Sequence, residues 1–217
     1  MKSKSKLFAF ALFAIVLCLS QNNAAAQEMK DDMNKDMKMK KDGSKMKMSM
    51  SDMKNWPAAS QMAAKDMMDK YGRPDEMTPT MLVWNNRGPW AKTVVYNKEY
   101  LHSFPMQHTD VMQQWVSYKV PTDKLNELAM YDGSVVVERT TGMISARCDK
   151  EGANFLALNL AHDIATAKRS VEDAREMYGK EVMKMKSGQM TEYTKGLMFS
   201  ANLNAADADV ALEKKNM

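Results

Sequence analysis

The chain has 217 residues, 45% hydrophobic and 27% charged, with a formal net charge of +4, which suits one ordinary domain with tails rather than two large domains. With only nine Gly, six Pro and two Cys, the composition excludes a collagen-like chain and a disulfide-held scaffold, and the charge content excludes a multi-span membrane protein. Methionine is the unusual residue type, because 24 Met outnumber the 17 Trp, Tyr and Phe together.

Residues 1–26 have the pattern of a secretory signal peptide. Three lysines precede a 13-residue apolar run at 7–19, and three alanines at 24–26 offer a cleavage site before Gln27. The run is too short to span a bilayer. We therefore expect an exported protein, periplasmic or extracellular, with no transmembrane helix after cleavage. Cleavage lowers the formal charge from +4 to +1, which argues against nucleic acid as a partner.

We expect Cys18 to be removed with the signal peptide and Cys148 to stay in the mature chain. Cys18 follows Leu17, and a lipoprotein signal requires a small residue there, so we do not expect lipid anchoring at Cys18. Cys148 is then the only cysteine and cannot form an intramolecular disulfide. It lies in step with Ile144 and Ala146 on a predicted strand, and this favours a buried apolar role over a reactive thiol.

Residues 27–54 form a Met/Lys/Asp-rich segment with no aromatic residue, Leu, Ile or Val. Such a composition cannot build a core, so we expect a disordered linker. Its residues 33–37 (MNKDM) and 39–43 (MKKDG) resemble the MXKDX pentapeptide repeats of small exported bacterial proteins. The resemblance lies in composition more than in a kept repeat register.

Three functions are open for this linker. It could be a solvated tether, which is the interpretation we favour. Thioethers spaced two apart, at Met46, Met48 and Met50, could instead bind Cu(I) or Ag(I), although the interleaved lysines would repel a cation. A third alternative is a sink for oxidants, since exposed Met is readily converted to the sulfoxide.

Residues 55–182 have the patterns of a folded domain. Pro57 fits the first turn of a helix, and small or apolar residues recur every four positions until Gly72 and Pro74 end it. Four strands rich in Val, Trp, Tyr and Thr follow, the first two joined by turn-forming residues. We expect these strands over residues 80–84, 92–96, 100–104 and 113–120.

The second half of the domain adds two strands and three helices. A short helix from Thr122 precedes strands at 135–139 and 143–148, and helices at 155–165 and 170–182 follow. The sequence thus predicts an α+β domain: a small antiparallel sheet of five to six strands, with an N-terminal helix and C-terminal helices packed on one face. Residues 183–217 are expected to be a flexible tail with at most one loose helix around 205–214.

Three segments of the chain resemble an uncharacterised family of exported bacterial proteins. They are KYGRPDE at 70–76, SARCD at 145–149 and NFLALNL at 154–160. The resemblance covers about two-thirds of the chain and implies export and a single domain. It implies no activity and no site residues.

Candidates for chemistry are few, because the sequence contains no HExxH, GxSxG, CxxC, phosphate-binding glycine loop or EF-hand loop. His102 and His108 lie six residues apart, near Glu99 and Asp110, and such a loop could hold Zn or Cu. We favour ordinary polar loop residues over a metal site. For His162, on a predicted helix, we expect a hydrogen-bonded packing role.

Two tryptophans and an arginine bracket the first predicted turn. Trp84, Arg87 and Trp90 could form a binding face, because Trp and Arg are the residue types that anchor interfaces. Packing in the core is the interpretation we favour for the indoles.

The expected function is therefore that of a non-enzymatic, exported envelope-binding or stress-related module on a flexible tether, with an unknown envelope protein or ligand as its partner. Two alternatives stay open. One is periplasmic handling of Cu(I) or Ag(I) by the Met-rich linker, and the other is a metal-dependent enzyme that uses His102 and His108.

Overall fold

The computed structural model describes residues 50–212, with side-chain positions from Met53 onward. The expected signal peptide, Cys18 and most of the expected linker at 27–54 lie outside the described residues. Within residues 50–212, no helix is both long enough and apolar enough to cross a membrane.

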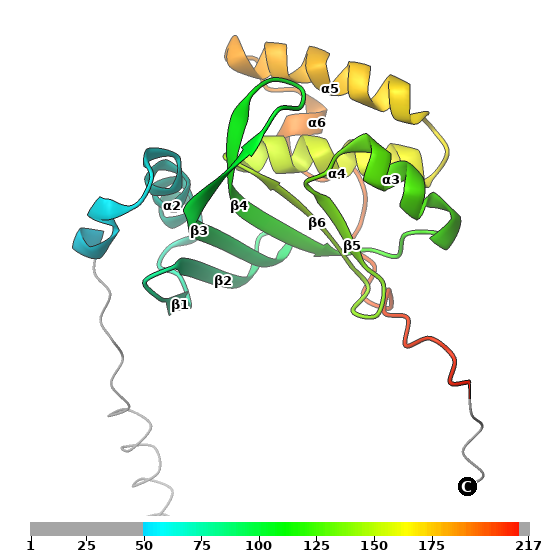
Figure 1. Cartoon of the computed structure of the whole chain (residues 1–217), viewed down its shortest axis with the longest axis horizontal. Helices are drawn as coiled ribbons and strands as arrows, with labels where there is room; N and C mark the ends of the chain where they lie inside the picture. Colours follow the sequence, from blue (N-terminus) through cyan, green and yellow to red (C-terminus); the bar gives the residue numbers. More distant parts are fainter. Residues whose placement is uncertain (1–49, 213–217) are drawn as a thin grey trace, which may run out of the picture. The chain divides into compact units, whose positions relative to one another are not determined.

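A six-stranded antiparallel sheet forms the centre of the domain, in the order β1-β2-β3-β4-β6-β5 (Figure 1). Successive strands pair as hairpins, except that β4 pairs with β6 and leaves β5 at the edge. This confirms the predicted α+β class and strand number. The strands are β1 (Glu76–Met77), β2 (Met81–Arg87), β3 (Trp90–His102), β4 (His108–Ser117), β5 (Val135–Glu138) and β6 (Met143–Cys148).

Among the described residues, one α-helix precedes the strands in sequence, one short α-helix interrupts them and three follow them, and the N- and C-terminal helices pack on one face of the sheet, as expected. Figure 1 shows α4 against the sheet, with α5 and α6 beyond it. The α-helices are α2 (Ala58–Tyr71), α3 (Leu125–Tyr131), α4 (Glu151–Ala165), α5 (Val171–Lys186) and α6 (Glu192–Lys195). The short 3-10 helices are η1 (Met50–Asn55) and η2 (Thr122–Lys124).

Alternation along the strands determines which side chains face the helices. Leu82 and Trp84 of β2 point to α2, whereas Val83 between them belongs to a smaller cluster on the other face. Helix α4 lies between the sheet and α5, and twelve of its fifteen residues are buried. A helix enclosed in this way needs apolar residues around most of its circumference, which explains its wide apolar stripe.

The β3–β4 hairpin is longer than the sequence predicts. The expected strands at 92–96 and 100–104 are one strand, β3, whose pairing with β4 shifts register between Val95 and Tyr100. Strand β4 begins at His108 rather than at residue 113, and the two-residue strand β1 was not expected. The sequence does not show that β3 is continuous, because residues 97–99 are polar and the bulge that contains them interrupts the alternation of inward and outward side chains.

Both ends of the described segment pack more closely than expected. Met53, assigned to the linker, is buried beside Trp56 against the small residues of α2. The expected tail from residue 183 instead completes α5, forms α6 and buries Ala205 against the turn at Gly142. Residues 205–212 form no helix. These corrections share one cause: a few apolar side chains in polar segments fill space that the sheet and α4 leave open.

Candidate metal centre

The β3–β4 hairpin brings His102 and His108 directly opposite each other. Their Cα atoms are register partners where the two strands leave the turn, so both side chains lie on one face of the sheet. Asp110 follows His108 by two residues in β4 and points to the same face. This face is the one that the helices cover. Strand pairing alone therefore gathers two imidazoles and a carboxylate.

The three side chains approach within the range of a single small cation. The imidazole rings have centroids 5.0 Å apart. Nε2 of His108 is 3.2 Å from Oδ1 of Asp110, and Nδ1 of His102 is 3.5 Å from Oδ2. One donor atom from each residue lies within 4.8 Å of the other two. Small side-chain rotations would bring all three donors to one ion.

Each imidazole has a separate partner for its other nitrogen. Nδ1 of His108 is 2.9 Å from the carbonyl oxygen of Met106, to which it can donate. Nε2 of His102 is 3.6 Å from Oδ1 of Asp132, the residue after α3. When the outer nitrogen donates its proton outward, the inner nitrogen can hold either a second proton shared with Asp110 or a lone pair for a metal ion. Both inward nitrogens then face Asp110.

Ser134 supports the same centre from the start of β5. Its hydroxyl donates to Oδ2 of Asp110 and lies 3.3 Å from Nδ1 of His102. Its backbone N–H donates to Asp132 at 2.8 Å, which holds the turn after α3 in place. Asp132 and Ser134 thus orient the acid and one imidazole from a segment that is distant in sequence.

The two carboxylates of the centre are deeply buried. Asp110 is 4% exposed and Asp132 3% exposed. Oδ1 of Asp110 has Nε2 of His108 as its partner, 3.2 Å away. The hydrogen bond with the Asp110 carboxylate raises the pKa of His108 to about 11. Burial raises the pKa of Asp132. The centre therefore already holds a positive charge, the His108 proton, next to the Asp110 carboxylate, and a metal ion would bind in place of that proton.

Cys148 ends β6 and is buried beside His108. Its expected burial is confirmed, and its Sγ donates to Oδ1 of Asp149 at 3.5 Å. Burial raises the pKa of the thiol, which keeps the sulfur protonated and weakly nucleophilic. Its sulfur does not belong to the close group of donors formed by the two histidines and Asp110.

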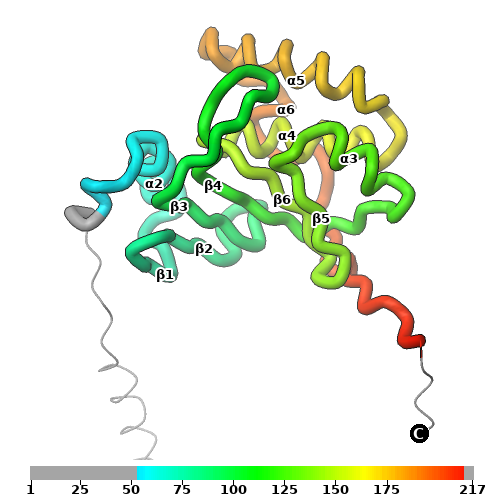
Figure 2. The backbone as a smooth tube through the Cα atoms, in the orientation of Figure 1, coloured from blue at the N-terminus to red at the C-terminus, as the bar shows by residue number. Residues whose placement is uncertain are grey.

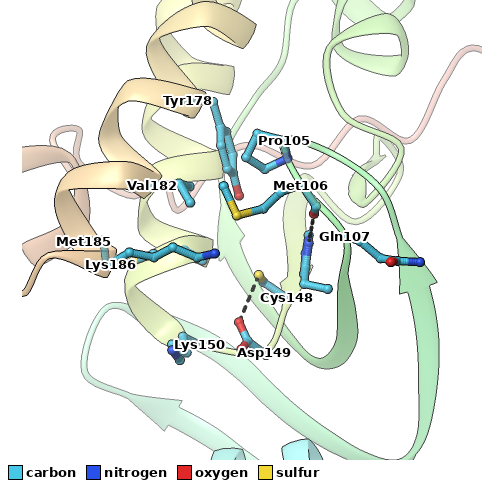
Figure 3. Close-up of a pocket in the computed structure, with 12 residues that line it drawn as sticks. Pro105, Met106, Gln107, Cys148, Asp149, Lys150, Tyr178, Val182, Met185 and Lys186 are labelled. Carbon is cyan, nitrogen blue, oxygen red and sulfur yellow. Dashed lines mark hydrogen bonds between the residues drawn. The ribbon is translucent and has the colours of Figure 1, made fainter.

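A pocket lies on the other side of His108. It is bounded by the β3–β4 turn, the junction of β6 and α4, and the last turns of α5 (Figure 3). Figure 2 shows the β3–β4 hairpin reaching beyond the sheet toward α5. His108 and Cys148 contribute to its lining, so the metal-binding candidates and the pocket share one wall.

The other sequence candidates lie elsewhere. Glu99 is exposed and does not join the histidines, because the register shift in β3 places it outside the cluster. His162 has the expected packing role: its Nδ1 is 2.7 Å from the Tyr118 hydroxyl and its ring stacks on Phe199. Met46 and Met48 lie outside the described residues. Met50 begins η1, but its side chain is outside the described part.

The proposed binding face at the first turn lacks exposed indoles. Trp84 and Trp90 are 0% and 1% exposed. Trp90 stacks on Phe155 with centroids 4.8 Å apart and donates to Glu151 at 2.7 Å. Arg87 is bound to Asp75. Both tryptophans therefore pack in the core, which is the favoured interpretation. They cannot form an exposed binding face, because α2 and α4 cover the face of the sheet from which they project.

Sequence reasoning missed Asp132 and Ser134. The Asp-Gly pair at 132–133 indicates a turn, but nothing in its spacing connects that turn to His102, thirty residues earlier. The connection comes from the crossover that pairs β6 with β4 and places β5 beside β6. Such long-range neighbours have no local sequence signal.

Comparisons with known protein families, with curated proteins and with solved structures give no match. No residue role can be carried over from a relative. Function is therefore inferred from the arrangement of the side chains.

Proposed function

We propose that this protein is an exported zinc-binding protein whose domain binds one Zn²⁺ through His102, His108 and Asp110. The observation that carries the proposal is the convergence of one donor atom from each of the three residues, all within 4.8 Å of one another around the buried Asp110. Imidazole and carboxylate are common zinc ligands, with metal–ligand distances of about 2.0–2.2 Å. An ion between these donors would replace the His108 proton and compensate the buried negative charge of Asp110.

The outer partners of the two imidazoles support the same assignment. Histidines that bind metals usually donate their second N–H to a carboxylate or a backbone carbonyl, which fixes the tautomer and the ring orientation. His102 has Asp132 in this position and His108 has the Met106 carbonyl. An ordinary polar loop would not require both rings to be held with their free nitrogens toward one acid.

Zinc fits the donor set better than the other common metals. Two nitrogen donors disfavour Mg²⁺ and Ca²⁺, which prefer oxygen. No thioether is among the three close donors, which disfavours Cu(I) at this position. Cu²⁺ accepts imidazole and carboxylate and is the main competitor, so it belongs in the same binding experiment.

The proposed role is a non-enzymatic binding module, exported by residues 1–26 and held on the Met/Lys/Asp-rich linker. The signal-peptide pattern supports export, and the absence of known catalytic motifs from the sequence supports a binding role. Handling of Cu(I) or Ag(I) by Met46, Met48 and Met50 remains a separate proposal for the linker. The two activities would use chemically distinct ligands, because thioethers select soft ions.

A zinc-dependent hydrolase is the second candidate function. Three protein ligands leave a fourth position for water or substrate, which is typical of catalytic zinc sites. The pocket on the far side of His108 is the specific observation that favours it. Turnover of a panel of ester and phosphoester substrates that requires zinc and His108 would favour the enzyme over the binding module.

The binding experiment uses the mature chain, prepared metal-free, in competition with a chromophoric zinc chelator. We expect about one zinc per chain and loss of binding in His102→Ala, His108→Ala and Asp110→Asn, because each change removes a ligand. His162→Ala is the matched control, since this histidine lies outside the cluster. Zinc bound equally well by the ligand variants would refute the proposal.

Two further measurements separate the linker and the export signal from the zinc site. Replacement of Met46, Met48 and Met50 by Leu should leave zinc affinity unchanged while weakening any Cu(I) binding. Mass spectrometry of the protein recovered from its producing cells should show Gln27 as the first residue. A chain that keeps residues 1–26, or one that begins with an acylated Cys18, would contradict the export proposal as stated.

A further inference from the structure

The pocket beside His108 is a candidate binding site in its own right. It has a volume of about 120 Å³, which is close to that of a cavity able to hold a benzene-sized group. Three distant parts of the chain form it: the β3–β4 turn, the start of α4 and the end of α5. Because these elements pack on one another in the core, the pocket is built into the fold.

The floor of the pocket is apolar and its rim is cationic. Ala153, Tyr178 and Val182 are buried at 3%, 3% and 7% exposure. Lys150 and Lys186 line the same pocket and are exposed. Figure 3 shows the Lys186 side chain extending into the pocket toward Cys148, and the Tyr178 hydroxyl pointing toward the same space. A ligand would thus meet apolar surface inside and positive charge at the entrance.

The two rim lysines are available for a ligand. Among the ion pairs of the described residues, none includes Lys150 or Lys186, although other lysines of α5 are paired. Asp149 is the one acidic residue of the lining, and it accepts the hydrogen bond of the Cys148 thiol. Two ammonium groups against one carboxylate leave the entrance with net positive charge.

We infer that this pocket binds a small organic monocarboxylate, with its apolar chain against Tyr178 and Val182 and its carboxylate beside Lys186. One apolar group and one negative charge match an apolar floor of this size with a lysine at its entrance. A phosphate monoester carries about two charges and is usually held by Arg forks, and no Arg lines this pocket. The pocket does not require zinc, so this inference stands apart from the proposed metal site.

Hexanoate is a suitable probe, and isothermal titration of the mature chain measures its binding. We expect saturable binding of hexanoate, weaker binding of hexanol and none of hexylamine. Lys186→Met keeps the alkyl chain and removes the charge, so we expect about two- to fivefold weaker binding, the loss typical of an exposed ion pair. Lys180→Met, on the same helix but outside the pocket, is the matched control and should bind as the wild type does.

Zinc affinity measured on the same variants keeps the two proposals distinguishable. Lys186→Met should bind zinc normally, because the lysine is not among the metal donors. The carboxylate inference is overturned if hexanoate shows no saturable binding, if hexylamine binds as well as hexanoate, or if Lys186→Met leaves the affinity unchanged. Tighter binding of hexyl phosphate than of hexanoate would also overturn it, in favour of a phosphate site.

Discussion

The Nε2 atom of His108 lies 3.2 Å from Oδ1 of Asp110, and the Asp110 side chain is buried. In the metal-free chain the positive charge of the His108 imidazolium compensates this carboxylate, whose presence raises the pKa of His108 to about 11. A metal ligand must be unprotonated, so zinc would take the place of that proton. The Asp110 carboxylate is thus paired with a positive charge in both states: the His108 imidazolium without the metal, and zinc with it.

Asp132 should influence zinc without binding it. Replacement by Asn keeps an oxygen for the Ser134 backbone N–H but removes the charge that faces Nε2 of His102. We expect zinc affinity to fall about 10- to 100-fold, as for other outer partners of ligand histidines. Chelator competition measures the change. Asp123→Asn, at an exposed position in η2, is the control, and equal affinities of the two variants would contradict the assigned role of Asp132.

Asp163 should make stability depend on acid pH. Burial raises its pKa, but hydrogen bonds from Tyr193, Lys168 and Arg169 outweigh burial and hold the pKa below its usual value. A depressed pKa in the folded state stabilises the fold above the unfolded pKa of about 4, and this contribution is lost as pH falls through the folded pKa.

The test of this role of Asp163 is urea unfolding of the wild type and Asp163→Asn across pH. At pH 7 we expect the variant to lose about 2 kcal/mol, the value of hydrogen bonds to a charged group. The difference should shrink as pH is lowered below about 4, because the wild-type carboxyl becomes neutral as well. A difference that stays constant with pH would show that lost packing, rather than charge, causes the destabilisation.

Gly142 should be intolerant of any side chain. Its φ is +67°, and an added Cβ would lie 2.3 Å from backbone atoms of Ala205 and Ala206. We expect Gly142→Ala to cost more than about 1–2 kcal/mol, the cost of the left-handed backbone alone, and to release the C-terminal segment. Gly133→Ala is the control, since nothing lies within 4 Å of its added Cβ. Equal unfolding free energies of the two variants would show that the contact with Ala205 is not stabilising.

The sequence was sufficient for the architecture because the periodicities are strong. The contiguous apolar residues of β2, the alternation in β6 and the wide apolar stripe of α4 identify these elements in the sequence. The sequence does not predict the folded structure of residues 183–212, because this segment contains too few apolar positions to show a helical or strand period. Their packing depends on single side chains such as Ala205.

The candidate site was only partly predictable. His102 and His108 stand out because the chain has three histidines, and two of them flank a turn. The choice between Glu99 and Asp110 depends on the register shift in β3, which composition does not reveal. Asp132 lies near the two histidines because β6 pairs with β4 and β5 pairs with β6. This strand order depends on the whole sheet and not on a local sequence pattern.

Zinc binding by His108→Ala, compared with the wild type and His162→Ala, tests the central claim most directly. We expect about one zinc per chain in the wild type and in His162→Ala, and at least about 100-fold weaker binding in His108→Ala, beyond the loss typical of an outer partner. Zinc at a hundredfold excess over its dissociation constant should also stabilise the first two proteins by about 2.7 kcal/mol. Wild-type binding no tighter than millimolar, or equal binding by His108→Ala, would contradict the assignment of this cluster as a metal site.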